Sequence, residues 1–302
     1  MTNSNKYDII IIGGSYAGLS AAMALGRSLK NVLIIDSGQP CNKQTPHSHN
    51  FITHDGETPA AISKKAKEQV LKYDTVTFIE DKATKAVKTT QGFDIETEAG
   101  KTYHAKKLIF ATGVKDLLPE TEGFKECWGI SIIHCPYCHG YEVKGEATGL
   151  LMNGDMAFEM AKFISNWTQD LTVFTNGVST LTAEQTEKLH SKKINIVEKE
   201  VKQFEHVNGY MTHIVFTDDS KHPLKAMYAR PALKQHCDIP EQLGCTLTEQ
   251  GYILVDTFQK TTVPGIYAAG DCTVMFRSVS KAVSEGTMAG AMLNKEWADE
   301  NF

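Results

Sequence analysis

The segment 135–139 reads Cys-Pro-Tyr-Cys-His and holds the residues with the most direct chemistry in this chain. Two cysteines separated by two residues can close into a small disulfide that thiol–disulfide exchange opens and reforms. His139 follows Cys138 directly, and an imidazole titrates near neutral pH, so it can move a proton during that exchange. We therefore take Cys135, Cys138 and His139 as the candidate catalytic residues.

The same segment has other interpretations. Cys-x-x-Cys-His is also the attachment sequence of c-type haem, which is installed outside the cytoplasm, whereas 1–6 is polar and shows no secretory signal. A structural zinc site needs two further ligands, and Cys127, Cys237 and Cys245 form no second close pair. We expect no metal site. Two unrelated buried thiols, or a purely structural His139, are the remaining alternatives.

A nucleotide-binding pattern opens the chain and suggests where electrons come from or go. A β-branched run at 7–12 predicts a strand buried on both faces of a parallel sheet. A glycine-rich turn at 13–18, a helix at 19–29 and a strand at 31–35 follow, which is the order of a dinucleotide-binding fold. Small turn residues let backbone N–H groups approach a pyrophosphate at the helix N-terminus, and Asp36 is placed to bind the adenosine ribose.

The predicted nucleotide-binding residues of this segment are Gly13, Gly14, Ser15, Ala17, Gly18, Asp36 and Ser37. Ser15 stands where a second glycine is usual. Because serine is small and can donate its own hydroxyl, we expect the site to be intact.

A second, weaker α/β unit begins near Thr148. Strands are expected at 149–152 and 171–174, a helix at 158–167, and a hairpin around Asn208-Gly209. Gly154 remains of the first two fingerprint glycines, Met152 stands at the first, and 175–179 carries no positive charge.

Composition bounds the answer further. At 302 residues the chain is long enough for two domains, and its 41% apolar and 22% charged residues are ordinary for a globular protein. The net charge of -5 favours neither nucleic acid nor an anionic membrane as a partner, and no apolar run approaches the ~18 residues of a membrane span. Seven scattered cysteines fit a reducing cytoplasm.

Four motifs together resemble a known family. They are 12–18 (Ile-Gly-Gly-Ser-Tyr-Ala-Gly), 110–113 (Phe-Ala-Thr-Gly), 135–140 (Cys-Pro-Tyr-Cys-His-Gly) and 267–271 (Tyr-Ala-Ala-Gly-Asp). In order and spacing they are similar to the low-molecular-weight thioredoxin reductases and their relatives among the FAD-dependent pyridine nucleotide-disulfide oxidoreductases. The resemblance covers nearly the whole chain.

The resemblance implies an α/β protein with two Rossmann-like, three-layer dinucleotide-binding domains, the second inserted into the first. The FAD domain would comprise 1–116 and 246–302, and the inserted NAD(P)-binding-like domain 117–245 would carry the cysteine pair. Cys138 would face the flavin and Cys135 would attack the partner. Further FAD contacts implied by the family are Asn50, Ala111, Thr112, Gly113, Gly270, Asp271, Ser278 and Val279. The family also implies a cytoplasmic homodimer.

Two departures from the family pattern bear on the reaction. His139 stands where the reductases usually have aspartate, and 174–179 lacks the arginines that hold the 2′-phosphate of NADPH. NADPH and NADH therefore both stay open as donors. The run Cys-x-x-Cys-His-Gly-Tyr-Glu is similar to the corresponding segment in a side branch of this family, which includes fungal dithiol oxidases.

We expect an FAD-dependent disulfide oxidoreductase that exchanges electrons with a thioredoxin-like protein or a small dithiol or disulfide. The alternatives are an oxygen-dependent dithiol oxidase and a reductase fed by a donor other than NADPH. A flavin-binding regulatory protein without turnover would require an idle cysteine pair.

Overall fold

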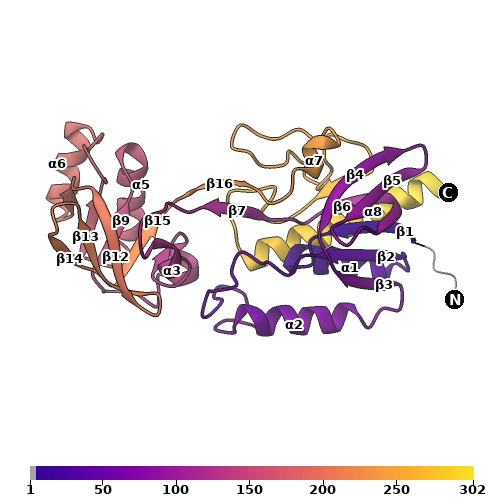
Figure 1. Ribbon diagram of the computed structural model, residues 1–302, viewed down its shortest axis with the longest axis horizontal. Helices are drawn as coiled ribbons and strands as arrows, with labels where there is room; N and C mark the ends of the chain where they lie inside the picture. Colours follow the sequence, from indigo (N-terminus) through magenta and orange to yellow (C-terminus); the bar gives the residue numbers. More distant parts are fainter. Residues whose placement is uncertain (1–4) are drawn as a thin grey trace. The chain divides into compact units, whose positions relative to one another are not determined.

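The computed structural model describes residues 5–302. Residues 1–4 of the polar segment 1–6, in which no secretory signal was found, therefore lie outside the described residues. The chain divides into two compact units (Figure 1). The first unit comprises the residues up to Lys43, then Phe51–Lys115 and Leu233–Phe302. The second comprises Gln44–Asn50 and Asp116–Ala232. The second unit is therefore inserted into the first.

The observed division differs from the expected boundaries at one end. The first crossover lies beside the expected residue 116, but the first unit resumes at Leu233 rather than at 246. The physical reason is burial, because Ile239 and Cys245 belong to the core of the first unit. A second difference is that Gln44–Asn50 groups with the second unit.

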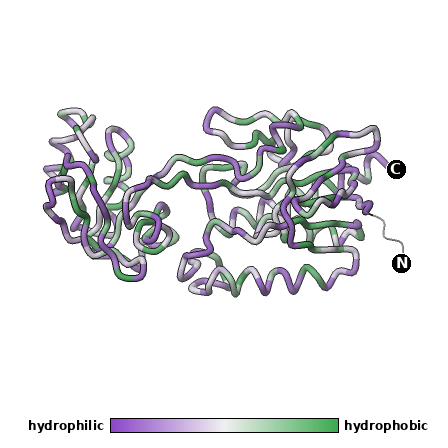
Figure 2. Tube along the Cα trace, viewed as in Figure 1, coloured by the Kyte–Doolittle hydropathy of each residue, from purple (hydrophilic) through white to green (hydrophobic). Residues whose placement is uncertain are grey.

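A seven-stranded sheet forms the centre of the first unit. Its order is β3-β2-β1-β6-β5-β4, with β17 beside β6. Pairs among β1, β2, β3, β6 and β17 are parallel, and β4–β5 and β5–β6 are antiparallel. The strands are β1 (Lys6–Ile12), β2 (Val32–Asp36), β3 (Val76–Glu80), β4 (Ala83–Thr89), β5 (Gly92–Thr97), β6 (Thr102–Phe110) and β17 (Ile266–Ala268). The central strands β1, β2 and β6 carry runs of buried hydrophobic side chains, and Figure 2 shows hydrophobic stretches in this unit.

Two helices of the first unit pack unusually closely. A Cβ added to Gly286 would lie 2.1 Å from the backbone oxygen of Ala17, and one on Gly290 would lie 2.6 Å from that of Ala21. Glycine at these positions thus lets α8 approach α1. The helices of this unit are α1 (Tyr16–Arg27), α2 (Pro59–Val70), α7 (Ile239–Gln242) and α8 (Val279–Asn301).

The second unit is built on a five-stranded parallel sheet of order β11-β10-β9-β15-β8 and a three-stranded antiparallel sheet β12-β13-β14. Its strands are β8 (Ile132–Ile133), β9 (Thr148–Leu151), β10 (Leu171–Phe174), β11 (Asn195–Val197), β12 (Val201–Val207), β13 (Tyr210–Phe216), β14 (Lys221–Pro223) and β15 (Ala226–Ala229). Its helices are α3 (Phe124–Cys127), α4 (Pro136–His139), α5 (Gly154–Ile164) and α6 (Ala183–Ser191). Both crossovers form short strands, β7 (Val114–Leu117) and β16 (Ala232–Gln235), which pair with each other.

The predicted α/β architecture is confirmed, and so is the hairpin between β12 and β13. Asn208 and Gly209 both have positive φ, 52° and 84°, as a tight hairpin turn requires. Within residues 5–302 no helix is long and apolar enough to cross a membrane.

Candidate functional site

The cysteine pair lies at the start of the short helix α4. Cys135 is its N-cap, and Pro136 occupies the first helical position, where its fixed φ and missing N–H suit a helix start. Cys135 and Cys138 form a disulfide with a Cα–Cα distance of 5.3 Å. Cys135 is buried and Cys138 is half-buried. One helical turn therefore brings the two sulfur atoms within bonding reach.

His139, the next residue, is half-buried in the second unit. Burial lowers the pKa of its imidazole to about 4, with His49 lowering it further and Glu142 opposing both. The ring is therefore neutral near pH 7. A neutral imidazole beside the redox pair is the state that can accept a proton from a thiol.

A loop from elsewhere in the sequence packs near this motif. Gln44 Nε2 donates to the backbone oxygen of Trp128 over 3.0 Å, and His49 Nε2 lies 3.5 Å from Glu142 Oε1. Neither His49 nor Glu142 was predicted to lie beside the redox motif. Glu142 could have been found, because it ends the run Cys-x-x-Cys-His-Gly-Tyr-Glu, and His49 directly precedes Asn50, which the resemblance places along the flavin.

The predicted nucleotide turn of the first unit is assembled around the start of α1. A Cβ on Gly13 would lie 2.2 Å from the backbone oxygen of Ala111, and one on Gly18 1.9 Å from that of Gly13. These contacts bring the 111–113 segment against the turn. Ser15, the N-cap of α1, makes no side-chain capping bond, and the first turn holds no acidic residue. Such an N-terminus suits a pyrophosphate.

Asp36 ends β2 beside this turn. Its Oδ2 accepts a hydrogen bond from the backbone N–H of Gly14 over 2.5 Å, and its Oδ1 accepts one from Gly38 over 2.8 Å. A carboxylate has about four acceptor sites, so capacity remains for a ribose hydroxyl. Ser37 is exposed after the strand.

The loop before α8 is held against α1 by a residue that the sequence reasoning missed. Glu285 of α8 is 6% exposed, and its Oε2 accepts from the backbone N–H of Gly270 over 2.8 Å and from Thr273 Oγ1 over 3.2 Å. Gly270 has φ +84°, and a Cβ there would lie 2.9 Å from that of Ala17. Glu285 thus fixes the turn that holds Asp271. Glu285 was not predicted, because it is distant in sequence from that turn.

The remaining predicted FAD residues fall into two groups. Ser278 is the N-cap of α8 and accepts from the backbone N–H of Lys281, so Ser278 and Val279 form that helix start. Asn50 belongs instead to the segment that groups with the second unit. The structure therefore assembles the predicted FAD residues within one unit, except Asn50.

In the second nucleotide-type fold, the side chain of Asn153 connects the turn before α5 to the loop after β10. Asn153 Oδ1 accepts from the backbone N–H groups of Gly154 and Thr180, each over 2.8 Å, and its Nδ2 donates to the backbone oxygen of Val178. Glu198 Oε1 accepts from the backbone N–H of Ser179. The first N–H group of α5, at Gly154, is thus occupied, and a carboxylate lies at the loop that lacks the arginines.

Met152 occupies the first glycine position of the second fingerprint, where added bulk would crowd a bound nucleotide. In the structure Met152 is 9% exposed and its side chain belongs to a hydrophobic core of the second unit. The bulk of Met152 is therefore directed into the core.

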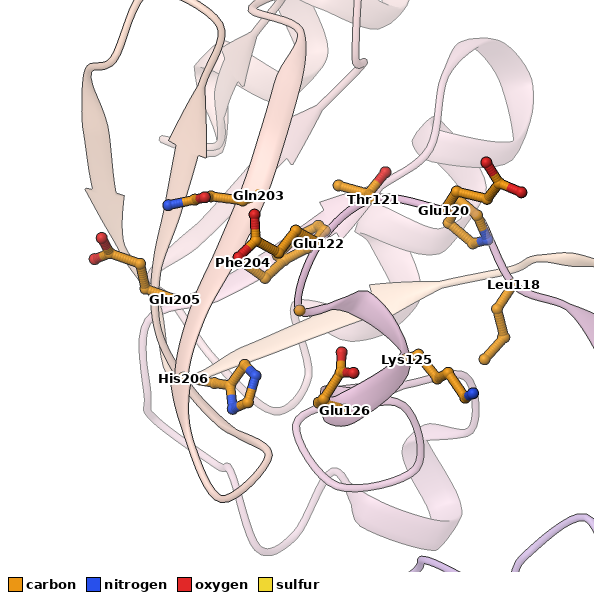
Figure 3. Close-up of a pocket in the computed structure, with 12 residues that line it drawn as sticks. Leu118, Glu120, Thr121, Glu122, Lys125, Glu126, Gln203, Phe204, Glu205 and His206 are labelled. Atoms are coloured by element: carbon orange, nitrogen blue, oxygen red, sulfur yellow. The ribbon is translucent and has the colours of Figure 1, made fainter.

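The second unit also carries a groove of about 730 Å³ between the segment 118–126 and β12 (Figure 3). Glu120, Glu122, Glu126 and Glu205 line it together with Lys125 and His206. None of the predicted site residues is among its lining residues. The groove therefore lies outside the redox motif.

Comparison with known proteins decides the family. The family model described as pyridine nucleotide-disulphide oxidoreductase matches residues 7–286. The chain belongs to this family. That span includes both the fingerprint turn and the cysteine pair.

Individual relatives agree. The chain is 33% identical to thioredoxin reductase tcpT of Claviceps purpurea, over 98% of this chain and 96% of that protein. It is 32% identical to thioredoxin reductase sirT of Leptosphaeria maculans, over 95% and 93%. Among solved structures, an oxidoreductase from Agrobacterium tumefaciens is 37% identical with a TM-score of 0.90, covering 97% of this chain and 99% of the other.

The protein is an FAD-dependent disulfide oxidoreductase of the thioredoxin reductase type. The residues present fit that cofactor, because the uncapped start of α1, the close-packed glycines and Asp36 form a cradle for an adenine dinucleotide. The expected family, fold class, function and flavin cofactor are thereby confirmed.

Proposed function

We propose that this protein exchanges two electrons between bound FAD and a substrate dithiol or disulfide through Cys135 and Cys138, with His139 moving the proton. The observation that supports this most directly is the closed Cys135–Cys138 disulfide followed by a half-buried, neutral imidazole. Bound FAD supplies or accepts the electron pair. The other five cysteines form no disulfide, and three of them are buried.

In the reducing direction, the Cys135 thiolate attacks one sulfur of the substrate disulfide. The substrate's S–S bond breaks, a mixed disulfide forms, and the first substrate thiolate leaves and takes a proton. The Cys138 thiolate then attacks Cys135 Sγ, which releases the second substrate thiolate and closes the Cys135–Cys138 disulfide. The substrate gains two electrons and two protons, and the oxidising direction is the same sequence reversed.

The proposed partner is a thioredoxin-like protein or a small dithiol or disulfide. The names of the relatives support the first class. We further propose a homodimer and a reducing, cytoplasmic location. That location is supported by the five cysteines outside the motif, which form no disulfide, because reducing compartments keep thiols reduced.

A second candidate function is exchange with an electron donor or acceptor other than NADPH. It is favoured by the contacts of Asn153 and Glu198 in the second nucleotide-type fold. Asn153 occupies the N–H group of Gly154 at the start of α5, and Glu198 places a carboxylate near the 175–179 loop. Both features disfavour the NADPH 2′-phosphate. Electrons could then flow from a substrate dithiol to the flavin and on to oxygen.

Trapping of the mixed disulfide tests the proposed roles. Anaerobically reduced protein is mixed with glutathione disulfide or oxidised thioredoxin, and adducts are measured by mass spectrometry. Cys138→Ser should accumulate a mixed disulfide on Cys135, Cys135→Ser should form none at the motif, and the wild type should close its own disulfide. Cys127→Ser is the matched control, because burial raises the pKa of that thiol and makes it inert. A mixed disulfide on Cys138 in Cys135→Ser, with none on Cys135 in Cys138→Ser, would refute the assigned roles.

A further inference from the structure

Glu285 is a buried carboxylate of α8 that contacts the turn after β17. Its Oε2 accepts a hydrogen bond from the backbone N–H of Gly270 over 2.8 Å, and among the described residues this N–H has no other acceptor. Thr273 Oγ1 lies 3.2 Å from the same carboxylate oxygen and 2.8 Å from the backbone oxygen of Gly270. Because a hydroxyl has a single proton to share between two acceptors, the bond to the Gly270 N–H is the contact that Glu285 alone supplies.

The turn that Glu285 holds carries Asp271, one of the residues expected to bind FAD. The backbone N–H of Thr273 donates to the backbone oxygen of Gly270 over 2.9 Å, so Asp271 lies inside a hydrogen-bonded turn. Gly270 has φ +84°, a conformation that favours glycine. The direction in which Asp271 points therefore depends on a turn that Glu285 holds at its first residue.

The next residue of α8, Gly286, contacts the predicted nucleotide turn. A Cβ on Gly286 would lie 2.1 Å from the backbone oxygen of Ala17, and a Cβ on Gly270 would lie 2.9 Å from the Cβ of Ala17. Ala17 belongs to the first turn of α1, where the pyrophosphate is expected. Glu285 and Gly286 together thus join two FAD-binding segments that lie about 250 residues apart in sequence.

The charge of Glu285 is compensated within its own helix. Lys281 Nζ lies 2.7 Å from Glu285 Oε1, and the two side chains are 37% and 7% exposed. A buried carboxylate without this partner would add a negative charge to a site for an anionic cofactor. Paired with Lys281, Glu285 offers its other oxygen as an acceptor with little net charge. Its contribution is therefore one of hydrogen-bond geometry rather than of charge.

We propose that Glu285 is a positioning residue for FAD, whose carboxylate oxygen holds the turn 270–273, and with it Asp271, in the geometry that binds the cofactor. Without this acceptor the buried N–H of Gly270 has no partner, and the turn of the free protein rearranges to find one in water. Binding of FAD must then restore the turn, and that cost is measured as a weaker affinity. The proposal rests on FAD binding and not on the roles assigned to Cys135 and Cys138.

Three substitutions separate the acceptor from its charge. Glu285→Gln removes the charge and keeps an acceptor oxygen at the same reach, while the partly exposed Lys281 can turn into water. Glu285→Asp keeps the charge but shortens the side chain by one C–C bond, about 1.5 Å, which takes the oxygen out of hydrogen-bonding distance of Gly270. Glu285→Met keeps the length and offers only a weak sulfur acceptor. Asp299→Leu removes an exposed carboxylate paired with Lys295 on the same helix and is the control.

The first measurement is the dissociation of FAD from each diluted holoenzyme, followed by the rise in flavin fluorescence. Glu285→Asp and Glu285→Met should weaken FAD binding roughly 10- to 100-fold, as expected for a buried donor without an acceptor. Glu285→Gln and Asp299→Leu should stay within about 3-fold of the wild type. If Glu285→Met does not fold, the contrast between the Asp and Gln variants decides alone.

The second measurement separates positioning from a general loss of structure. ADP shares the adenosine diphosphate half of FAD, which the fingerprint turn and Asp36 are predicted to bind. ADP binding to the full-length apoprotein, measured by calorimetry, should therefore be the same in the wild type and the variants. Equal losses of FAD and ADP affinity would overturn the proposal in favour of a purely structural role. A Gln variant as weak as the Asp variant, or an Asp variant that binds FAD like the wild type, would also overturn it.

Discussion

The charge state of single residues in the redox motif follows from burial more than from sequence neighbours. His139 has an ordinary pKa of 6.5, lowered to about 4 in the folded protein. Because the folded-state pKa is lower than the unfolded one, the unfolded chain binds a proton first as the pH falls. The contribution to stability is therefore fully present above pH 6.5 and is lost progressively between 6.5 and 4.

This linkage predicts a pH-dependent difference between the wild type and His139→Gln. Between about pH 7.5 and 4.5 the wild type should lose about 2–3 kcal/mol more unfolding free energy than the variant, from the 6.5-to-4 change in pKa. Urea denaturation of both proteins at the two pH values measures the difference. An identical loss in both would show that the imidazole is not buried as described.

The residues predicted from sequence were those whose signal is local. Cys135, Cys138 and His139 are contiguous, and Gly13 to Gly18 form one turn, so spacing alone indicated their chemistry. Glu285 binds Gly270, which lies 15 residues away in sequence. His49 contacts Glu142, which lies about 90 residues away. Such contacts could not be predicted, because they form only on folding and no periodic pattern in the sequence relates the two partners.

Among the elements, the contact between α1 and α8 leaves no room for a single added methyl group. A methyl group at Gly286 would meet the backbone oxygen of Ala17 at 2.1 Å, which backbone movement alone can relieve. Ala17 also lies beside the turn that holds Gly270. Packing of α8 and the shape of the predicted flavin cradle are therefore coupled.

We predict that Gly286→Ala destabilises the protein by about 1–3 kcal/mol through overpacking and weakens FAD retention. Thermal unfolding and the FAD content after gel filtration are the measurements. Ser284→Ala, an exposed position on the same helix, serves as the control and should match the wild type in both. Full FAD content and unchanged stability in Gly286→Ala would contradict the coupling.

The contacts of the loop after β10 predict which electron donor reduces the flavin. NADPH should reduce the flavin poorly and show little preference over NADH, because Asn153 occupies the N–H group of Gly154 and Glu198 lies at the loop. Each missing charge-assisted bond to the 2′-phosphate forfeits about 1.5–3 kcal/mol. Stopped-flow mixing with each nucleotide tests this. Rapid stoichiometric bleaching by micromolar NADPH, with NADH much slower, would overturn it.

At the scale of the whole molecule, the insertion of one nucleotide-type fold in another was implied by the family resemblance that four motifs carry. The boundary at 233 was not, because α7 and the residues after it are placed by burial against the first unit rather than by any turn signal. The grouping of Gln44–Asn50 with the second unit was equally hidden. It depends on contacts with Trp128 and Glu142.

The central claim is that electrons pass between FAD and substrate only through Cys135 and Cys138. The most direct measurement mixes the purified holoprotein anaerobically with dithiothreitol and follows the yellow absorbance of the flavin in the wild type, Cys135→Ser and Cys138→Ser. The account predicts that the dithiol bleaches the wild-type flavin and leaves the flavin of both variants oxidised, with FAD bound equally in all three. Bleaching of either variant at the wild-type rate would contradict it.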